Sequence, residues 1–186
     1  GVKRIVLARE CNLGQIKEIK KKSKIEIEVF IHGAMCVSLS GRCFMSHHLF
    51  GKSANRGECL QPCRRQYLVK DAEESNELIL GQDYVMSPKD LCTIKFIDKI
   101  IETKVDSLKI EGRKRSAEYV YTTVAAYRKA IDLYFKNKLN FKVKDELFSE
   151  LEKVYNRGFS SGFYFKRPSG KEFVNVHGSK ATERKV

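Results

Sequence analysis

The start of the chain alternates between strand-like and helix-like patterns of apolar residues. Residues 4–8 form a short apolar run bounded by charges, and residues 25–31 place isoleucine or valine at every second position, as strands do. Between them, residues 12–23 place Leu13, Ile16 and Ile19 on one helical face, with lysines opposite. A strand, a helix and a strand at this spacing predict a βαβ unit, and such a unit implies a parallel sheet.

The later part of the chain continues this alternation. Residues 66–71 and 77–87 are predicted to pair as a hairpin, with the acidic residues 72–76 as its turn. A helix is predicted to begin at Pro88 with Ser87 as its N-cap, and residues 106–111 are predicted to form a buried strand. The longest helix is expected to follow the N-cap Ser116, before a short amphipathic helix within residues 136–158. The predicted buried face of the longest helix consists of Val120, Val124, Tyr127 and Ile131.

A long segment without helix or strand period separates these two parts. Residues 38–70 contain three glycines and Pro62, a composition typical of a functional loop. The order of elements predicts an α/β fold, either part of a TIM-like (β/α)8 barrel (its C-terminal half) or a small open sheet, with a long cysteine-rich loop insertion. In such barrels the functional residues lie at the carboxyl ends of the strands. Cys36 and Glu111 each follow an apolar strand, so we expect them on the same rim.

The cysteines are the main candidates for chemistry. Without a secretory signal a disulfide framework is not favoured, and isolated buried thiols are the simple alternative, which suits Cys11. Zinc would favour paired C-x-x-C motifs, to which only Cys59 and Cys63, at C-x3-C, come close. Thiolates at irregular spacing in a glycine-rich loop favour an iron–sulfur cluster, with zinc as the alternative. The six cysteines are Cys11, Cys36, Cys43, Cys59, Cys63 and Cys92.

The charge balance predicts an anionic partner. The net charge is +13, from 36 lysines and arginines against 23 acidic residues. Nucleic acid is the first candidate, and a lysine-rich surface without a specific partner is the alternative. Between Cys36 and Arg65, Glu58 alone is acidic, so this segment is the predicted RNA contact. Its basic residues are Arg42, Lys52, Arg56, Arg64 and Arg65.

The sequence offers no sign of a membrane or secretory segment. It has no run of 18 apolar residues, and residues 1–10 lack the pattern of a signal peptide. We therefore expect no membrane span and a cytoplasmic location. Because the chain lacks an initiator methionine and begins almost inside a strand, we also expect it to be a fragment.

Residues 28–46, EVFIHGAMCVSLSGRCFMS, resemble the signature of the collagenase-like peptidase family, peptidase family U32. The segments around the later cysteines and the segment SLKIEGRKRSAEYV are also similar to this family, so the resemblance covers nearly the whole chain. It implies a partial barrel over residues 1–165 and the truncated start of a C-terminal segment over residues 166–186. The signature positions in register are Glu28, Phe30, Gly33, Ala34, Cys36, Gly41, Cys43 and Ser46.

The resemblance also implies an activity. Several members of the family are oxygen-independent hydroxylases with a 4Fe–4S cluster that act on tRNA uridine, on a ribosomal RNA cytidine or on a ubiquinone precursor. For the members that act on RNA, prephenate is the implied cosubstrate, and 5-hydroxyuridine in tRNA is the product that we expect here. Cys63 falls in the family pattern but outside the ligand quartet, and Cys11 receives no role. The implied cluster ligands are Cys36, Cys43, Cys59 and Cys92.

Three further residues are candidates for catalysis. His32 precedes the glycine of the signature, although a histidine satisfied by backbone at a strand end is the alternative. Glu111 and Arg113 end a strand, where barrel enzymes place site residues, although an ion pair that caps the next helix is the alternative. His47 and His48 are interpreted as loop residues. A peptidase is the second hypothesis, because no H-E-x-x-H, G-x-S-x-G or aspartic dyad motif is present.

Overall fold

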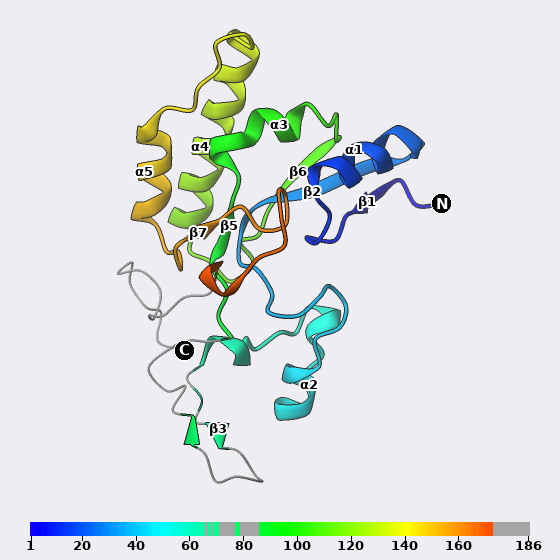
Figure 1. Ribbon diagram of the computed structural model, residues 1–186, viewed down its shortest axis with the longest axis vertical. Coiled ribbons are helices and arrows are strands. Elements are labelled where there is room, and N and C mark those ends of the chain that lie inside the picture. The colour runs from blue at the N-terminus through cyan, green and yellow to red at the C-terminus, as the bar shows by residue number, and fades with distance from the viewer. Residues whose placement is uncertain (66, 68, 71–76, 79–85, 173–186) are drawn as a thin grey trace.

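A computed structural model describes residues 1–65, 67, 69–70, 77–78 and 86–172 (Figure 1). Its strands form an open mixed sheet around β2 (Glu26–Gly33), which pairs in parallel with β1 (Arg4–Val6) and with β6 (Ser107–Ile110). β5 (Asp90–Cys92) is antiparallel to β2, and β7 (Phe159–Ser160) is parallel to β5. The α/β class and the parallel pairing of the three predicted strands are confirmed. The described strands do not close into a barrel.

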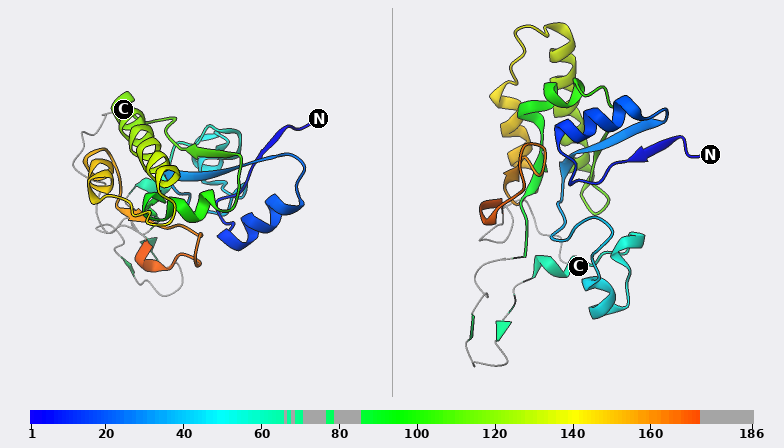
Figure 2. Two further views of the ribbon diagram at one scale, coloured as in Figure 1. Left: turned by 90° about the horizontal axis from the view of Figure 1, so that it is seen from above. Right: turned by 45° about the vertical axis from the view of Figure 1, so that its right-hand side comes forward.

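Helices cover one face of this sheet. α1 (Leu13–Lys22) links β1 to β2, and its N-cap Asn12 forms a capping box with Gln15. The long helix α4 (Ala117–Lys136) follows β6 and is capped by Ser116, as predicted. The shorter helices are α3 (Ile97–Ile101) and α5 (Asp145–Lys153). In both Figure 1 and Figure 2 the cysteine-rich segment, with α2 (Met45–Phe50), projects from the end of this sheet-and-helix body.

The core lies between β2 and the helices. Every second residue of β2 points into it, and Ile27, Val29 and Ile31 are each no more than 2% exposed. Side chains of α3, α4 and α5 meet them there. Each such side chain removed from water contributes roughly 1.5–3 kcal/mol, so this layer fixes which face of β2 turns inward. The fully buried partners include Ile94, Ile97, Ile100, Ala130 and Leu151.

The predicted helix from Pro88 is wrong. Residues 90–92 instead form the strand β5, because Asp90 N donates to Gly158 O (3.0 Å) and Leu91 pairs with both β2 and β7. Helical structure begins only after this strand, with a 3₁₀ turn at Ile94–Phe96 and then α3. Ser87 is buried and accepts a hydrogen bond from Arg64 instead of capping a helix. Tertiary pairing has overridden the local signal.

The buried face of α4 also differs from the predicted one. Val120 and Val124 are 40% and 48% exposed, whereas Tyr127 is buried and Ile131 is partly buried. The face of α4 that packs against the core is shifted by about one residue from the predicted face. It is rich in tyrosine and alanine. Its buried residues are Tyr119, Thr123, Ala126, Tyr127, Ala130 and Tyr134.

Further short elements complete the description. The hairpin is confirmed as an antiparallel pair of β3 (Val69–Lys70) and β4 (Glu77–Leu78), while its predicted turn lies outside the described residues. Short 3₁₀ turns occur at Ala54–Arg56, Pro62–Arg64 and Gly170–Glu172. No helix among the described residues is long and apolar enough to cross a membrane. The domain boundary at residue 165 stays a prediction.

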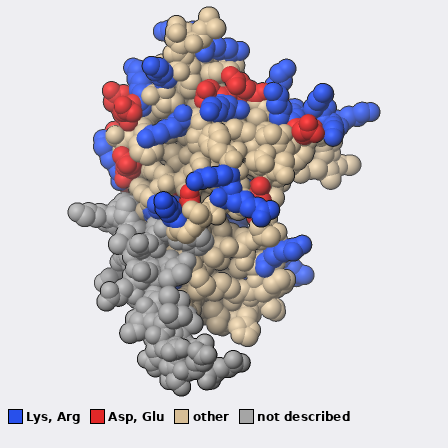
Figure 3. Space-filling view, in the orientation of Figure 1, with Lys and Arg blue, Asp and Glu red and all other residues tan. Residues whose placement is uncertain are grey.

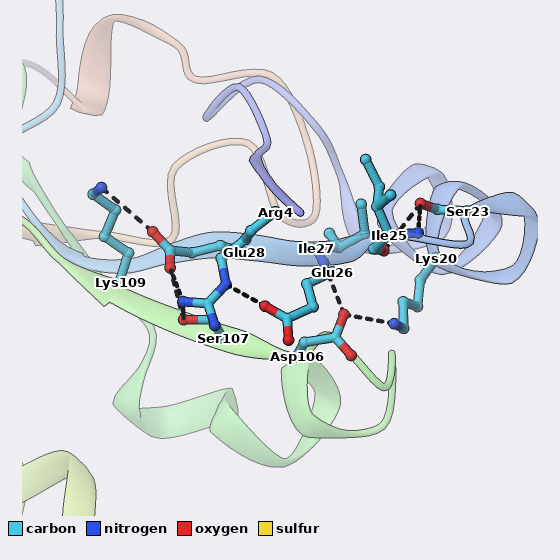
Figure 4. A network of polar contacts seen from close by, with 10 residues as sticks. All are labelled: Arg4, Lys20, Ser23, Ile25, Glu26, Ile27, Glu28, Asp106, Ser107 and Lys109. Atoms are coloured by element: carbon cyan, nitrogen blue, oxygen red, sulfur yellow. Dashed lines mark hydrogen bonds and ion pairs between the residues drawn. The ribbon is translucent and has the colours of Figure 1, made fainter. Parts of the chain in front are cut away.

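Charged side chains spread over the outside of this body. Basic residues outnumber acidic ones on the face that Figure 3 shows. Away from the core, Arg4, Glu28 and Lys109 form an ion-pair network across β1, β2 and β6 (Figure 4). Glu28 accepts from Ser107 Oγ (2.7 Å), and this bond together with the cations lowers the pKa of its carboxyl. The exposed pairs of this network contribute little to stability.

Replacing Ile97 by alanine should lower the free energy of unfolding by about 2–5 kcal/mol, because it leaves a cavity in the fully buried layer. The matched control is Val124→Ala, on the exposed side of α4, with an expected change within about 0.5 kcal/mol. Chemical denaturation measures both. Equal losses would contradict the observed orientation of α4.

Candidate functional site

The loops that follow β2 and β6 enclose a pocket of about 410 Å³. Four thiols line it, together with one carboxylate and an excess of cationic side chains. The thiols come from the segment after β2, and most of the cations come from the segment after β6. The thiols are those of Cys36, Cys43, Cys59 and Cys63, the carboxylate is Glu111, and the cations are Arg9, Arg64, Arg113, Lys114 and Arg115.

Gly33 brings the two segments together. Its φ of +108° lies in the left-handed region, and a Cβ there would lie 2.5 Å from the carbonyl oxygen of Glu111. Only glycine therefore allows the end of β2 to approach the end of β6 this closely. The backbone N–H of Glu111 donates to His32 O (2.9 Å) at the same point. Cys36 and Glu111 consequently line one pocket, as the sequence predicts.

The four thiols of the pocket differ in exposure. Cys36 is exposed, Cys43 and Cys59 are partly buried, and Cys63 is buried. Although Cys36 is exposed as a residue, partial desolvation of its thiol raises its pKa, and the neighbouring thiols of Cys43 and Cys59 raise it further, against a backbone hydrogen bond from Ser38. Burial also raises the pKa of Cys63, against the charge of Arg64. A set of soft sulfur donors of this kind fits a thiolate-bound metal centre. As the described side chains stand, no three potential ligands lie close enough to hold a single metal ion.

Cys92 lies apart from the other three predicted ligands. It is buried on β5, with its sulfur 3.8 Å from the hydroxyl of Tyr127, and burial raises its pKa to about 11. It does not line the pocket, whereas Cys63 does. The prediction that Cys92 would join Cys36, Cys43 and Cys59 is therefore not met in this structure, because residues 90–92 pair in the sheet.

His32 belongs to the core and not to the pocket. It is 1% exposed, and burial, with a smaller effect of Arg115, lowers its pKa to about 3, so the ring is neutral at physiological pH. Its Nδ1 lies 3.3 Å from the hydroxyl of Tyr127, which donates to Ile31 O and accepts from Thr93 N. These contacts support the alternative interpretation of a satisfied core histidine.

Glu111 and Arg113 both line the pocket, but not as an ion pair that caps the next helix. Glu111 Oε2 lies 3.7 Å from Arg9 Nη2, and Oε1 accepts from the backbone N–H of Arg113 (3.1 Å). The guanidinium of Arg113 instead donates to Gly57 O (3.0 Å), while Ser116 caps α4. The capping alternative is therefore wrong.

Of the basic residues proposed for RNA contact, Arg64 is partly buried and has a structural role. Its guanidinium donates to Met35 O (2.6 Å), Pro88 O (2.6 Å) and Ser87 Oγ (2.8 Å), which ties the cysteine segment to the sheet. Arg65 is exposed and lies over the ring of Phe50, 5.2 Å from its centroid. The remaining three side chains, of Arg42, Lys52 and Arg56, are also exposed.

A family model described as peptidase family U32 matches residues 1–173. The chain belongs to this family. The confirmed resemblance rests on the signature that carries Gly33 and the first two pocket cysteines.

Relatives within U32 have different names. The chain is 48% identical over 175 residues to an uncharacterized protease of Methanocaldococcus jannaschii, covering 88% of this chain and 42% of the relative. It is 44% identical over 187 residues to tRNA hydroxylation protein P1 of Bacillus subtilis, covering 98% of this chain and 44% of the relative. It is 42% identical over 193 residues to a collagenase of Porphyromonas gingivalis, covering 98% of this chain and 46% of the relative. The chain thus spans less than half the length of these relatives, and no solved structure matches it.

The structure adds residues to the site that the sequence patterns did not single out. Lys114 and Arg115 line the pocket beside Arg113, and their signal was the basic run directly after a strand and a glycine. Arg115 lies 3.6 Å from the buried carboxylate of Asp90, which Arg157 also approaches at 3.5 Å. Asp90 carried no signal of this role, because its neighbours come from distant parts of the chain.

Replacing Gly33 by alanine should destabilise the protein more than replacing Gly41. Both glycines have positive φ, which costs an alanine about 1–2 kcal/mol, but a Cβ at Gly41 meets nothing within 4 Å. At Gly33 the clash with the backbone of Glu111 adds to this cost. Denaturant titration of both variants measures the difference, and equal losses would show that the close approach of β2 and β6 is not required.

Proposed function

We propose that this U32 chain is part of an iron–sulfur-dependent, oxygen-independent hydroxylase that modifies RNA and forms 5-hydroxyuridine in tRNA, with prephenate as cosubstrate. The observation that carries the proposal is the gathering of four cysteine thiols in one cation-lined pocket. The name of the B. subtilis relative and that of tRNA hydroxylation protein P of Helicobacter pylori, 38% identical, support an RNA substrate. In the full-length protein we propose that the sheet closes into a (β/α)8 barrel.

In this proposal Cys36, Cys43, Cys59 and Cys63 hold a 4Fe–4S cluster. Cys63 replaces Cys92 in the set implied by the family resemblance, because it lines the pocket with the other three. The cluster supplies one-electron redox chemistry when bound. The surrounding arginines and Lys114 offset the negative charge that four thiolates bring into a partly buried site.

The cationic wall of the pocket is suited to carboxylates such as those of prephenate. Arg9 Nε is buried and has no hydrogen-bond partner among the described residues, whereas Arg115 Nη2 lies 3.6 Å from the carboxylate of Asp90. Both residues line the pocket, so their guanidinium groups add to the positive charge that would attract a bound carboxylate. Glu111 lies against Arg9 and holds its guanidinium at the pocket wall.

The outer surface of the cysteine segment is suited to RNA. Arg42, Lys52 and Arg56 are exposed there and can contact phosphates. Phe44 directly follows Cys43 and is 66% exposed, so its ring is free to stack on an unpaired base. Two other aromatic residues are less suited to stacking on a base. The hydroxyl of Tyr67 donates to Pro62 O (2.8 Å), and Phe163 packs against the core.

A peptidase is the second candidate, favoured by the names of the M. jannaschii and P. gingivalis relatives. A cysteine nucleophile needs a base within hydrogen-bond reach. No histidine is among the described residues that line the pocket, and the nearby His32 is buried in the core. This arrangement favours the hydroxylase. Hydroxylation of a ubiquinone precursor is the third candidate.

The ligand set can be tested by iron and sulfide content after anaerobic purification of the full-length protein. Cys63→Ser should lose most of the iron, whereas Cys92→Ser, which keeps a polar atom beside Tyr127, should retain it. Cys11→Ser, outside the pocket, is the matched control. Loss of iron from the Cys92 variant with retention in the Cys63 variant would restore the family-implied quartet.

The substrate can be tested by comparing modified nucleosides in tRNA from cells that carry either the full-length protein or its Cys43→Ala form. The variant should lack the 5-hydroxyuridine that depends on this protein, because the proposed cluster loses a ligand. Unchanged 5-hydroxyuridine would end the tRNA proposal. Peptide cleavage that survives the substitution would favour the peptidase, and altered quinone precursors in anaerobic cells would favour the quinone hydroxylase.

A further inference from the structure

Cys59 is contacted at its sulfur by two donors from within the cysteine segment. Its Sγ accepts a hydrogen bond from Gln61 N (3.3 Å) and lies 3.8 Å from Ser46 Oγ, which donates to it. Ser46 is fully buried, and its oxygen in turn accepts from Leu60 N (3.1 Å). The hydroxyl of Ser46 therefore has one orientation that satisfies both neighbours, with its proton towards the sulfur.

The backbone around Cys59 is held from the opposite direction by the segment after β6. Lys114 Nζ donates to Cys59 O (2.8 Å), and Arg113 Nη1 donates to Gly57 O (3.0 Å). Gly57 has a φ of +92°, and a Cβ there would lie 2.9 Å from Arg113 Nη1. Glycine at this position thus leaves the space that the guanidinium occupies.

We infer that Ser46, Arg113 and Lys114 are positioning residues for Cys59, which fix this thiol in place before metal binds. The inference rests on the proposed thiolate site. Ser46 acts on the sulfur directly, while Arg113 and Lys114 act on the carbonyls on either side of Glu58. Together they attach Cys59 to both α2 and the end of β6. The loop around Cys59 is therefore already ordered before the ligands bind metal.

This assignment gives physical roles to two residues whose sequence signals were ambiguous. Ser46 is a position of the family signature to which the sequence assigned no role, and Arg113 was a candidate for catalysis. A hydroxyl that donates to a thiolate lowers the negative charge on sulfur, and such outer contacts tune metal affinity and reduction potential. Cationic side chains near a thiolate likewise stabilise its negative charge.

The experiment uses the full-length protein, freed of iron and kept reduced, and titrates it with Co²⁺ while the thiolate-to-cobalt charge-transfer band is followed. Ser46→Ala, and separately the double change Arg113→Gln with Lys114→Gln, should weaken Co²⁺ binding roughly ten- to a hundred-fold. The matched controls are Ser53→Ala, within the cysteine segment, and the double change Lys21→Gln with Lys24→Gln, at exposed positions on and just after α1, which should bind as the wild type does. Circular dichroism of the metal-free variants checks that each is folded.

Two conservative variants keep the test decisive if Ser46→Ala does not fold. Ser46→Thr retains the hydroxyl and should keep most of the affinity, and Arg113→Lys retains a cationic donor and should recover part of it. In the iron-loaded protein, Ser46→Ala should also shift the reduction potential to a more negative value, because the sulfur loses a hydrogen-bond donor, whereas Ser46→Thr should keep the wild-type potential.

The outcomes separate this inference from the proposed function. Wild-type Co²⁺ affinity in both the Ser46 and the Arg113/Lys114 variants would overturn the positioning role while leaving the thiolate site intact. A normal cobalt band with loss of affinity in the variants, but no change in tRNA nucleosides, would support the positioning role and count against the RNA substrate. A wild-type protein without a thiolate–cobalt band would overturn both.

Discussion

The close approach of β2 to β6 at Gly33 is the constraint on which the site depends. The cysteine segment leaves β2 at this residue, and the cationic segment leaves β6 at Glu111, whose carbonyl would lie 2.5 Å from any Cβ at position 33. A residue with a side chain would separate the two strand ends. The thiols of one segment and the cations of the other would then no longer line one pocket. A single missing side chain thus determines where the chemistry of both loops can meet.

Charge compensation organises the pocket around this contact. Arg64, Arg113 and Lys114 all donate to carbonyl groups of the cysteine-bearing backbone, so these cations hold the loop in shape. Behind the pocket wall, Asp90 is 1% exposed and faces Arg115 at 3.6 Å. A buried carboxylate without such a partner would be costly, so the position of β5 and the position of Arg115 depend on each other.

The differing names of the U32 relatives become easier to reconcile at the level of this pocket. A thiol, a base and a peptide-binding groove would suit a protease, whereas several thiols in one pocket with a cationic wall suit a metal centre and an anionic substrate. Cys36, Cys43, Cys59 and Cys63 line one cation-rich pocket, which is why we propose the second character for this chain. His32, the nearest histidine in sequence to the first of them, is committed to Tyr127 in the core.

The sequence alone determined the parallel βαβ start, the strand before Glu111 and the helix after Ser116, because these follow from local periodicity and capping. It also indicated that the cysteine segment and the end of β6 share a rim. Only the tertiary structure decided that residues 90–92 form a strand, that Cys63 lies in the pocket while Cys92 does not, and that Arg64 binds the backbone at Met35. Each of these depends on a partner distant in the chain, such as β7 for Asp90 or Met35 for Arg64, and no local pattern encodes which partner the folded chain brings near.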